Sequence, residues 1–167
     1  NEALQILCAV LLTEETCIIE NVPEIRDVMK LIELLGNMGV VTERLAPNTW
    51  SFTAKNINLG FLETKEFAKQ GAALRGSIMI VGPLLARYGK AAIPRPGGDK
   101  IGRRRLDTHF IGFQNLGAKF DFDGTDNFYK VEAPKLKGAY MLLDEASVTG
   151  TANIVMAAVM AEGTTTI

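Results

Sequence analysis

Apolar residues recur along this chain in stretches that predict alternating helices and strands. Three apolar stretches predict buried helices, at Ala3–Leu12, Gly76–Ala86 and Asn153–Ala161. A short apolar run after each one predicts a strand, at Thr16–Glu20, Lys90–Ile93 and Thr164–Ile167. The predicted helices begin roughly 75 residues apart, which is longer than the period of solenoid repeats, so each unit must be a small module of helices and strands.

The second halves of the first two modules also match. Amphipathic helices are predicted at Glu24–Leu35 and Asp107–Leu116, and both stop at glycine-containing segments. A predicted hairpin follows each helix: Val40–Glu43 with Trp50–Ala54, and Lys119–Asp123 with Tyr129–Ala133. Pro47-Asn48 and Gly124-Thr125-Asp126-Asn127 suit the turns of these hairpins. Further strand material is predicted near Tyr140–Leu143. The pattern predicts an α/β (α+β) fold with repeats near 1–74, 75–150 and 151–167, the third only begun.

The composition of the chain argues against several classes of function. The chain has 167 residues and a net charge of −1, which suits one core and argues against general nucleic-acid binding. Cys8 and Cys17 lie in apolar runs without a Cys/His cluster, so neither a metal site nor a disulfide framework is predicted, and a reducing compartment is favoured. No apolar run approaches a membrane span, and no signal peptide is seen. Because the chain opens without Met inside a helical pattern, we expect a piece of a longer protein, cut at both ends.

The segment Arg95–Asp107 carries the most specific chemistry. Two adjacent glycines, Gly97 and Gly98, allow a sharp, movable turn just before the carboxylate of Asp99. Three arginines follow at Arg103–Arg105, and their guanidinium groups fit phosphate or carboxylate in a bidentate way. We interpret the segment as a lid that carries a proton donor over a small anionic substrate. A solvated surface loop with a run of charge is the alternative.

Short motifs occur along the whole chain, among them Pro96-Gly97-Gly98 followed by Ile101-Gly102 and Arg104. They resemble the enolpyruvyl transferases, and this motif is characteristic of the branch that acts on UDP-N-acetylglucosamine rather than shikimate 3-phosphate. The other matching stretches are Asn1-Glu2-Ala3-Leu4, Leu74-Arg75-Gly76-Ser77, Gly82–Gly89, Asp107-Thr108-His109, Leu116-Gly117-Ala118, Leu136–Ala139, Ser147-Val148 and Ala161–Thr165.

The resemblance implies an inside-out α/β domain of βαβαββ-type repeats, facing a second domain across a substrate cleft. Residues 1–167 are then most of one domain, and the second domain of the full protein is absent from this chain. The implied reaction moves enolpyruvate from phosphoenolpyruvate to the 3-hydroxyl of UDP-N-acetylglucosamine and releases phosphate, in the cytoplasm of a bacterium. It is the first committed step of peptidoglycan synthesis. Neither a metal nor another cofactor, nucleic acid or membrane is implied.

The resemblance also implies roles for individual residues. Asp99 is the expected catalytic acid, and Arg75 and Arg104 are expected to bind phosphoenolpyruvate. The expected contacts to UDP-N-acetylglucosamine are Asn1, Arg75, Arg104, Arg105, Leu106, Asp107, Thr108, Ser147, Val148 and Thr149. Asp107 is also readable as a helix N-cap. His109, the single histidine, is expected to be structural because the base of the reaction belongs to the missing domain.

Four positions depart from the pattern of the resembled branch. Most members carry cysteine where this chain has Asp99, and proline where it has Arg105. Glu145 stands where a basic residue is common, and Thr149 where glycine is usual. A catalytically inactive nucleotide-sugar or anion-binding module therefore stays open as an alternative. An enzyme like the RNA 3′-phosphate cyclases, which share related repeats, is a further one.

Overall fold

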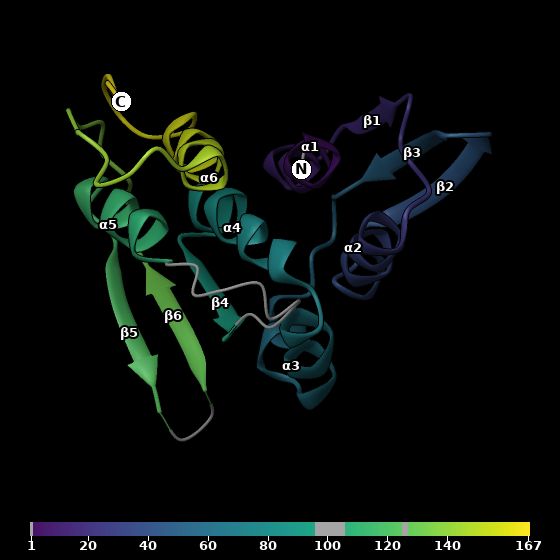
Figure 1. Ribbon diagram of the computed structural model, residues 1–167, viewed down its shortest axis with the longest axis horizontal. Helices are drawn as coiled ribbons and strands as arrows, with labels where there is room; N and C mark the ends of the chain where they lie inside the picture. Colours follow the sequence, from purple (N-terminus) through teal and green to yellow (C-terminus); the bar gives the residue numbers. More distant parts are fainter. Residues whose placement is uncertain (1, 96–105, 125–126) are drawn as a thin grey trace.

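The computed structural model describes residues 2–95, 106–124 and 127–167 (Figure 1). The first module contains α1 (Glu2–Ala9), the 3₁₀-helix η1 (Val10–Leu12), β1 (Thr16–Ile19), α2 (Arg26–Asn37), β2 (Val41–Ala46) and β3 (Thr49–Thr53). The second module follows η2 (Leu59–Glu63) and α3 (Lys65–Ala72), and it contains η3 (Arg75–Ile80), α4 (Val81–Tyr88), β4 (Lys90–Pro94), α5 (Asp107–Asn115), β5 (Lys119–Asp123) and β6 (Phe128–Glu132). The helix α6 (Val148–Ala158) begins a third unit.

The two sheets repeat one topology. Both are antiparallel and three-stranded, with strand orders β1-β3-β2 and β4-β6-β5. Asn48 and Asn127 precede β3 and β6 with φ of 57° and 58°, a left-handed conformation that asparagine tolerates in turns. Gly39 and Gly117, with φ of 102° and 94°, follow α2 and α5 in the same way. The two modules therefore share one strand order, and asparagine and glycine take the same positions in their turns.

Helices join the two modules, and the sheets lie at opposite ends of the molecule (Figure 1). The central helix α4 contacts both η1 and α6, while α6 also contacts α5 and α1. The core at these contacts is apolar, with Leu7, Leu84 and Ile154 fully buried. Burial of such side chains is the main favourable term in folding. The helices that begin with the predicted site residues are thus fixed by the core.

Several predicted elements have different bounds. The single helix predicted at Gly76–Ala86 is divided into η3 and α4. Pro83 lies in the first turn of α4, where its missing N–H and its ring prevent an α-helical bond to the turn before it. Helix α6 begins at Val148, five positions before the predicted Asn153, because Ser147 caps it by accepting a hydrogen bond from the Gly150 N–H.

The strands predicted at Tyr140–Leu143 and Thr164–Ile167 are wrong as strands. In the described part of the chain they are joined by one isolated parallel bridge, Tyr140↔Thr166, and a second isolated bridge, Lys137↔Glu162, lies just before them. A strand needs a ladder of backbone hydrogen bonds to a second strand, and the residue pattern of one segment does not show whether such a partner lies beside it. Helix α3 was missed because only Phe67 and Gly71 in it are buried, although Thr64 gives a capping signal by accepting from the Phe67 N–H at 3.1 Å.

Candidate functional site

The starts of α5 and α6 lie side by side, and seven of the predicted substrate contacts are in this part of the molecule. Thr108, at the start of α5, donates from Oγ1 to Asp144 Oδ1 at 2.7 Å, just before α6. A Cβ on Gly150 would lie 2.9 Å from Thr108 Cγ2. The described predicted contacts are Arg75, Leu106, Asp107, Thr108, Ser147, Val148 and Thr149. Asn1, Asp99, Arg104 and Arg105 lie outside the described residues.

Helix α5 begins differently from the prediction. Leu106 is its N-cap and makes no side-chain capping bond, while Asp107 is the first residue of the helix. The reading of Asp107 as an N-cap is therefore wrong. A carboxylate in the first turn still interacts favourably with the helix dipole. Asp107 is exposed, at the edge of the candidate site.

The Thr108 hydroxyl is already engaged by acidic neighbours. It lies 2.7 Å from Asp144 Oδ1 and 3.4 Å from Glu145 Oε1, and a hydroxyl has one proton to donate. Thr108 is 1% exposed, so its side chain serves the packing between α5 and α6. A ligand contact by Thr108 would therefore use its backbone N–H. Glu145, which stands where the resembled branch often carries a basic residue, therefore contacts the buried Thr108 hydroxyl.

Ser147 is the N-cap of α6. Its Oγ accepts from the Gly150 N–H at 3.1 Å, and its backbone carbonyl accepts from Thr151 Oγ1 at 2.7 Å. These bonds fix the first turn of the helix, where Val148 is 70% exposed. Backbone N–H groups in such a first turn point toward an incoming anion.

Arg75 begins η3 and lies close enough to His109 to act on its charge. Burial and, to a lesser extent, the positive charge of Arg75 lower the pKa of His109 from 6.5 to about 4. His109 is 3% exposed within α5. The imidazole is therefore neutral near pH 7, and the expected structural role of this histidine agrees with its burial.

The cysteines differ from each other. Cys8 is fully buried, and burial raises the pKa of its thiol well above the usual range, which makes it a poor nucleophile. Cys17, which also lies in an apolar run, is only partly buried. Strand β1 is an edge strand whose alternate residues face outward.

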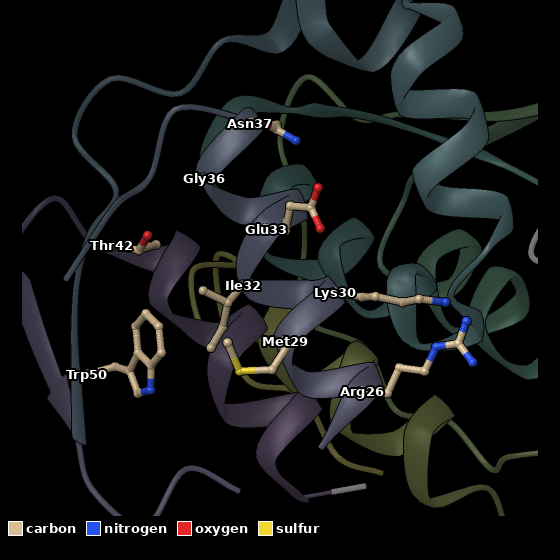
Figure 2. Close-up of a pocket in the computed structure, with 9 residues that line it drawn as sticks. All are labelled: Arg26, Met29, Lys30, Ile32, Glu33, Gly36, Asn37, Thr42 and Trp50. Carbon is tan, nitrogen blue, oxygen red and sulfur yellow. The ribbon is translucent and has the colours of Figure 1, made fainter. Parts of the chain in front are cut away.

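A separate hollow of about 620 Å³ lies on the first module, between α2 and the strands β2 and β3 (Figure 2). Met29 and Ile32 of α2 extend toward the indole of Trp50, while Arg26, Lys30 and Glu33, which also line the hollow, extend to the other side of the helix (Figure 2). None of the substrate contacts predicted within the described ranges lines this hollow. The charges along it are mixed.

Within residues 2–95, 106–124 and 127–167, no group of three or more His, Cys, Asp or Glu side chains has the geometry of a metal site. In the same part of the chain, no helix is both long and apolar enough to span a membrane.

Comparison with known proteins decides the family. All residues from 1 to 167 match the EPSP synthase (3-phosphoshikimate 1-carboxyvinyltransferase) family. The chain belongs to this family. Its repeated modules and its motifs thus have a common origin with those of the EPSP synthase family, as the resemblance predicted.

Similar proteins within the EPSP synthase family carry a different substrate in their names. The chain is 58% identical over its whole length to a UDP-N-acetylglucosamine 1-carboxyvinyltransferase of Bacteroides thetaiotaomicron and 55% identical to one of Porphyromonas gingivalis. It covers 38% of the length of each of these relatives.

Two solved structures share the fold of this chain. The enolpyruvyl transferase NikO from Streptomyces tendae matches 97% of this chain with a TM-score of 0.71 at 15% identity, over 37% of its own length. EPSP synthase from Acinetobacter baumannii matches 98% of the chain with a TM-score of 0.65 at 18% identity, again over 37% of that protein. The predicted α/β fold class is therefore confirmed.

Proposed function

We propose that the protein containing this chain transfers enolpyruvate from phosphoenolpyruvate to the 3-hydroxyl of UDP-N-acetylglucosamine. The observation that carries the proposal is the identity of 55–58% over the full chain to proteins named for this reaction. The reaction belongs to peptidoglycan synthesis, and hence to cell-wall growth, cell shape and division in the bacterial cytoplasm. Residues 1–167 then form most of one domain, with repeats near 1–74, 75–150 and 151–167, and a second domain completes the cleft.

The chemistry needs an acid, a base and cations. A proton goes to the methylene carbon of phosphoenolpyruvate, the sugar oxygen bonds to the adjacent carbon, and the hydroxyl proton goes to a base. Loss of phosphate and of one methyl proton then restores the double bond. We assign the first proton to Asp99. Its pKa must rise for this, and exclusion of water beside a bound phosphate would raise it.

The proposed substrate contacts are of two kinds, cationic side chains and backbone groups at the starts of helices. Arg75 and Arg104 are proposed to bind the anionic groups of phosphoenolpyruvate. The proposed nucleotide-sugar contacts are Asn1, Arg75, Arg104, Arg105, Leu106, Asp107, Thr108, Ser147, Val148 and Thr149. The adjacent starts of α5 and α6 support this assignment, because their backbone N–H groups can share one diphosphate.

The test uses the full-length protein with phosphoenolpyruvate and two acceptors. With UDP-N-acetylglucosamine we expect phosphate release and a product whose mass includes the enolpyruvyl group. With shikimate 3-phosphate we expect neither, and this acceptor is the matched control within the EPSP synthase family. Turnover of shikimate 3-phosphate alone would contradict the proposal. Nucleotide-sugar binding without turnover would favour the inactive binding module instead.

A further inference from the structure

Asn153 of α6 connects three helices through its side-chain amide. The residue is fully buried where α6 packs against α4 and α5 (Figure 1). Its Nδ2 donates to the Ile78 carbonyl at 2.9 Å and lies 3.0 Å from His109 Nδ1, while its Oδ1 accepts from the Gly82 N–H at 2.9 Å. A side chain at position 82 would collide with Asn153, so this close approach needs glycine.

The hydrogen bonds determine the orientation of both side chains. Gly82 N–H can only donate and the Ile78 carbonyl can only accept, so the Asn153 oxygen faces Gly82 and its NH₂ group faces Ile78. The second N–H of that group then points at His109 Nδ1, which must be an acceptor. A neutral imidazole with an acceptor at Nδ1 carries its proton on Nε2.

The neutral tautomer matters because Arg75 is near. A protonated His109 would carry a second ring N–H, at Nδ1, which would point at the Asn153 NH₂ group, and its charge would repel the Arg75 guanidinium. His109 lies next to Thr108 at the start of α5, and Ile78 lies in η3, which begins at Arg75. Asn153 therefore touches both segments that begin with proposed ligand contacts, and its own helix begins with the third.

We propose that Asn153 is a positioning residue for anion binding: it holds His109 as the neutral Nε2–H tautomer and keeps Arg75 and the starts of α5 and α6 directed at one ligand. This inference rests on the proposed function for the identity of the ligand, but the tautomer does not depend on it. Asn153 acts through its neighbours and does not touch substrate.

The first measurement is the tautomer itself in the full-length protein. Nitrogen chemical shifts distinguish the two neutral tautomers and the imidazolium, and the His109 signals are identified by their loss in His109→Asn. We expect the Nε2–H tautomer at neutral pH. An Nδ1–H tautomer or an imidazolium would overturn the inference without any change at Asn153.

The second measurement compares Asn153→Asp with Asn115→Asp. Asn153→Asp keeps the shape but removes both donors, so the His109 signals should move to an Nδ1-protonated form. The dissociation constant and KM for UDP-N-acetylglucosamine should rise about tenfold, as expected for a lost buried hydrogen-bond network, with kcat changed less. Asn115→Asp adds the same charge at an exposed position of α5 and should change the dissociation constant less than about twofold.

The outcomes separate the inference from the proposed function. A wild-type protein that gives the Nε2–H tautomer but no enolpyruvyl product would leave the tautomer lock standing and remove the proposed reaction. An active protein in which Asn153→Asp binds and turns over like the wild type would overturn the inference alone. If Asn153→Asp fails to fold, the tautomer of His109 measured in the wild-type protein still tests the inference.

Discussion

His109 shows, at the scale of one residue, how position rather than residue type sets chemistry. Histidine is the usual side chain for acid–base catalysis near neutral pH. Here its ring is 3% exposed and its pKa is lowered to about 4, mainly by burial. The ring therefore does not titrate in the range where such catalysis would use it, and the acid of the proposed reaction must be found elsewhere.

The lowered pKa of His109 predicts a pH-dependent stability. The unfolded chain binds a proton near pH 6.5 and the folded chain only near pH 4, so the contribution is fully present above pH 6.5 and is lost as the pH falls toward 4. The loss amounts to about 3 kcal/mol. Urea unfolding of the full-length protein at pH 7.5 and 4.5 measures it. His109→Asn keeps an acceptor for Asn153, and its free energy of unfolding should fall clearly less between pH 7.5 and 4.5. An equal fall in both proteins would show that His109 is not the group responsible.

Asp99 predicts an unusual inhibitor profile. Fosfomycin alkylates the cysteine found at this position in most of the resembled branch, and a carboxylate is a far weaker nucleophile than a thiolate. The full-length enzyme should therefore resist fosfomycin, and Asp99→Cys should become sensitive while it keeps turnover. Asp99→Asn should lose turnover yet bind UDP-N-acetylglucosamine. Mass spectrometry after drug treatment and steady-state rates are the measurements. A drug adduct on the unmutated protein, or near-normal turnover by Asp99→Asn, would contradict the assignment.

At the scale of secondary-structure elements, a single side chain can hold several elements together. Arg87 near the end of α4 donates to the backbone carbonyls of Leu11, Thr13 and Ala54, which end η1 and β3. Its side chain is 10% exposed, so these carbonyls depend on it rather than on water. The clamp joins the helix of the second module to the strands of the first.

Removal of the Arg87 clamp should destabilise the module contact. Arg87→Met keeps the length and loses the donors, and we expect a loss of about 2–4 kcal/mol in the free energy of unfolding. The matched control is Glu14→Gln, which breaks only the 2.9 Å ion pair to Arg87 from a side chain that is 61% exposed. That change should cost less than about 1 kcal/mol. Denaturant unfolding of both variants measures these changes. Similar losses in the free energy of unfolding for the two variants would show that the hydrogen bonds to the carbonyls do not stabilise the protein.

Two glycines in helices predict opposite effects of the same substitution. A Cβ on Gly82 would meet the carbonyl and amide oxygens of Asn153, so Gly82→Ala should force α4 and α6 apart and destabilise by about 2 kcal/mol or more. A Cβ on Gly36, an exposed position of α2, would meet only Thr42 Oγ1 at 3.9 Å. Gly36→Ala should stabilise by about 0.5 kcal/mol through helix propensity. Thermal melts test both signs, and a stable Gly82→Ala protein would contradict the close packing described.

The whole chain presents one side of the proposed reaction. Its helices bring Arg75, Asp107 and Ser147 into one region, but the base and the remaining cations are assigned to a second domain. Val155 of α6 and Val159, the C-cap of that helix, are 50% and 66% exposed. Exposed apolar residues on a helix are typical of a surface that contacts further protein.

We therefore expect the isolated 167-residue chain to bind UDP-N-acetylglucosamine weakly and to form no enolpyruvyl product. Binding across a cleft between two domains loses most of its contacts when one domain is absent. Calorimetry of the fragment beside the full-length protein measures the affinity, and a phosphate assay measures turnover. Phosphate release by the purified fragment above a control without enzyme would show that the catalytic groups lie within these residues.

The sequence by itself determined the modules, because helix and strand periodicity and turn chemistry are local. It predicted the helices near Ala3–Leu12 and Asp107–Leu116, and the turns at Asn48 and Asn127, from residues close together along the chain. The motifs also predicted the family correctly. Local patterns failed where a partner decides the outcome, as at Thr164–Ile167, which forms one isolated bridge within the described residues and no strand.

Only the tertiary structure decided how the candidate site is assembled. No local signal shows that Asn153, 44 positions beyond His109, fixes the proton on that ring, or that Thr108 donates to Asp144. Such contacts depend on how α4, α5 and α6 pack, and packing joins residues that are distant in the sequence. The same packing buries His109 and lowers its pKa, so the electrostatics of the site were set by the fold and not by the motif.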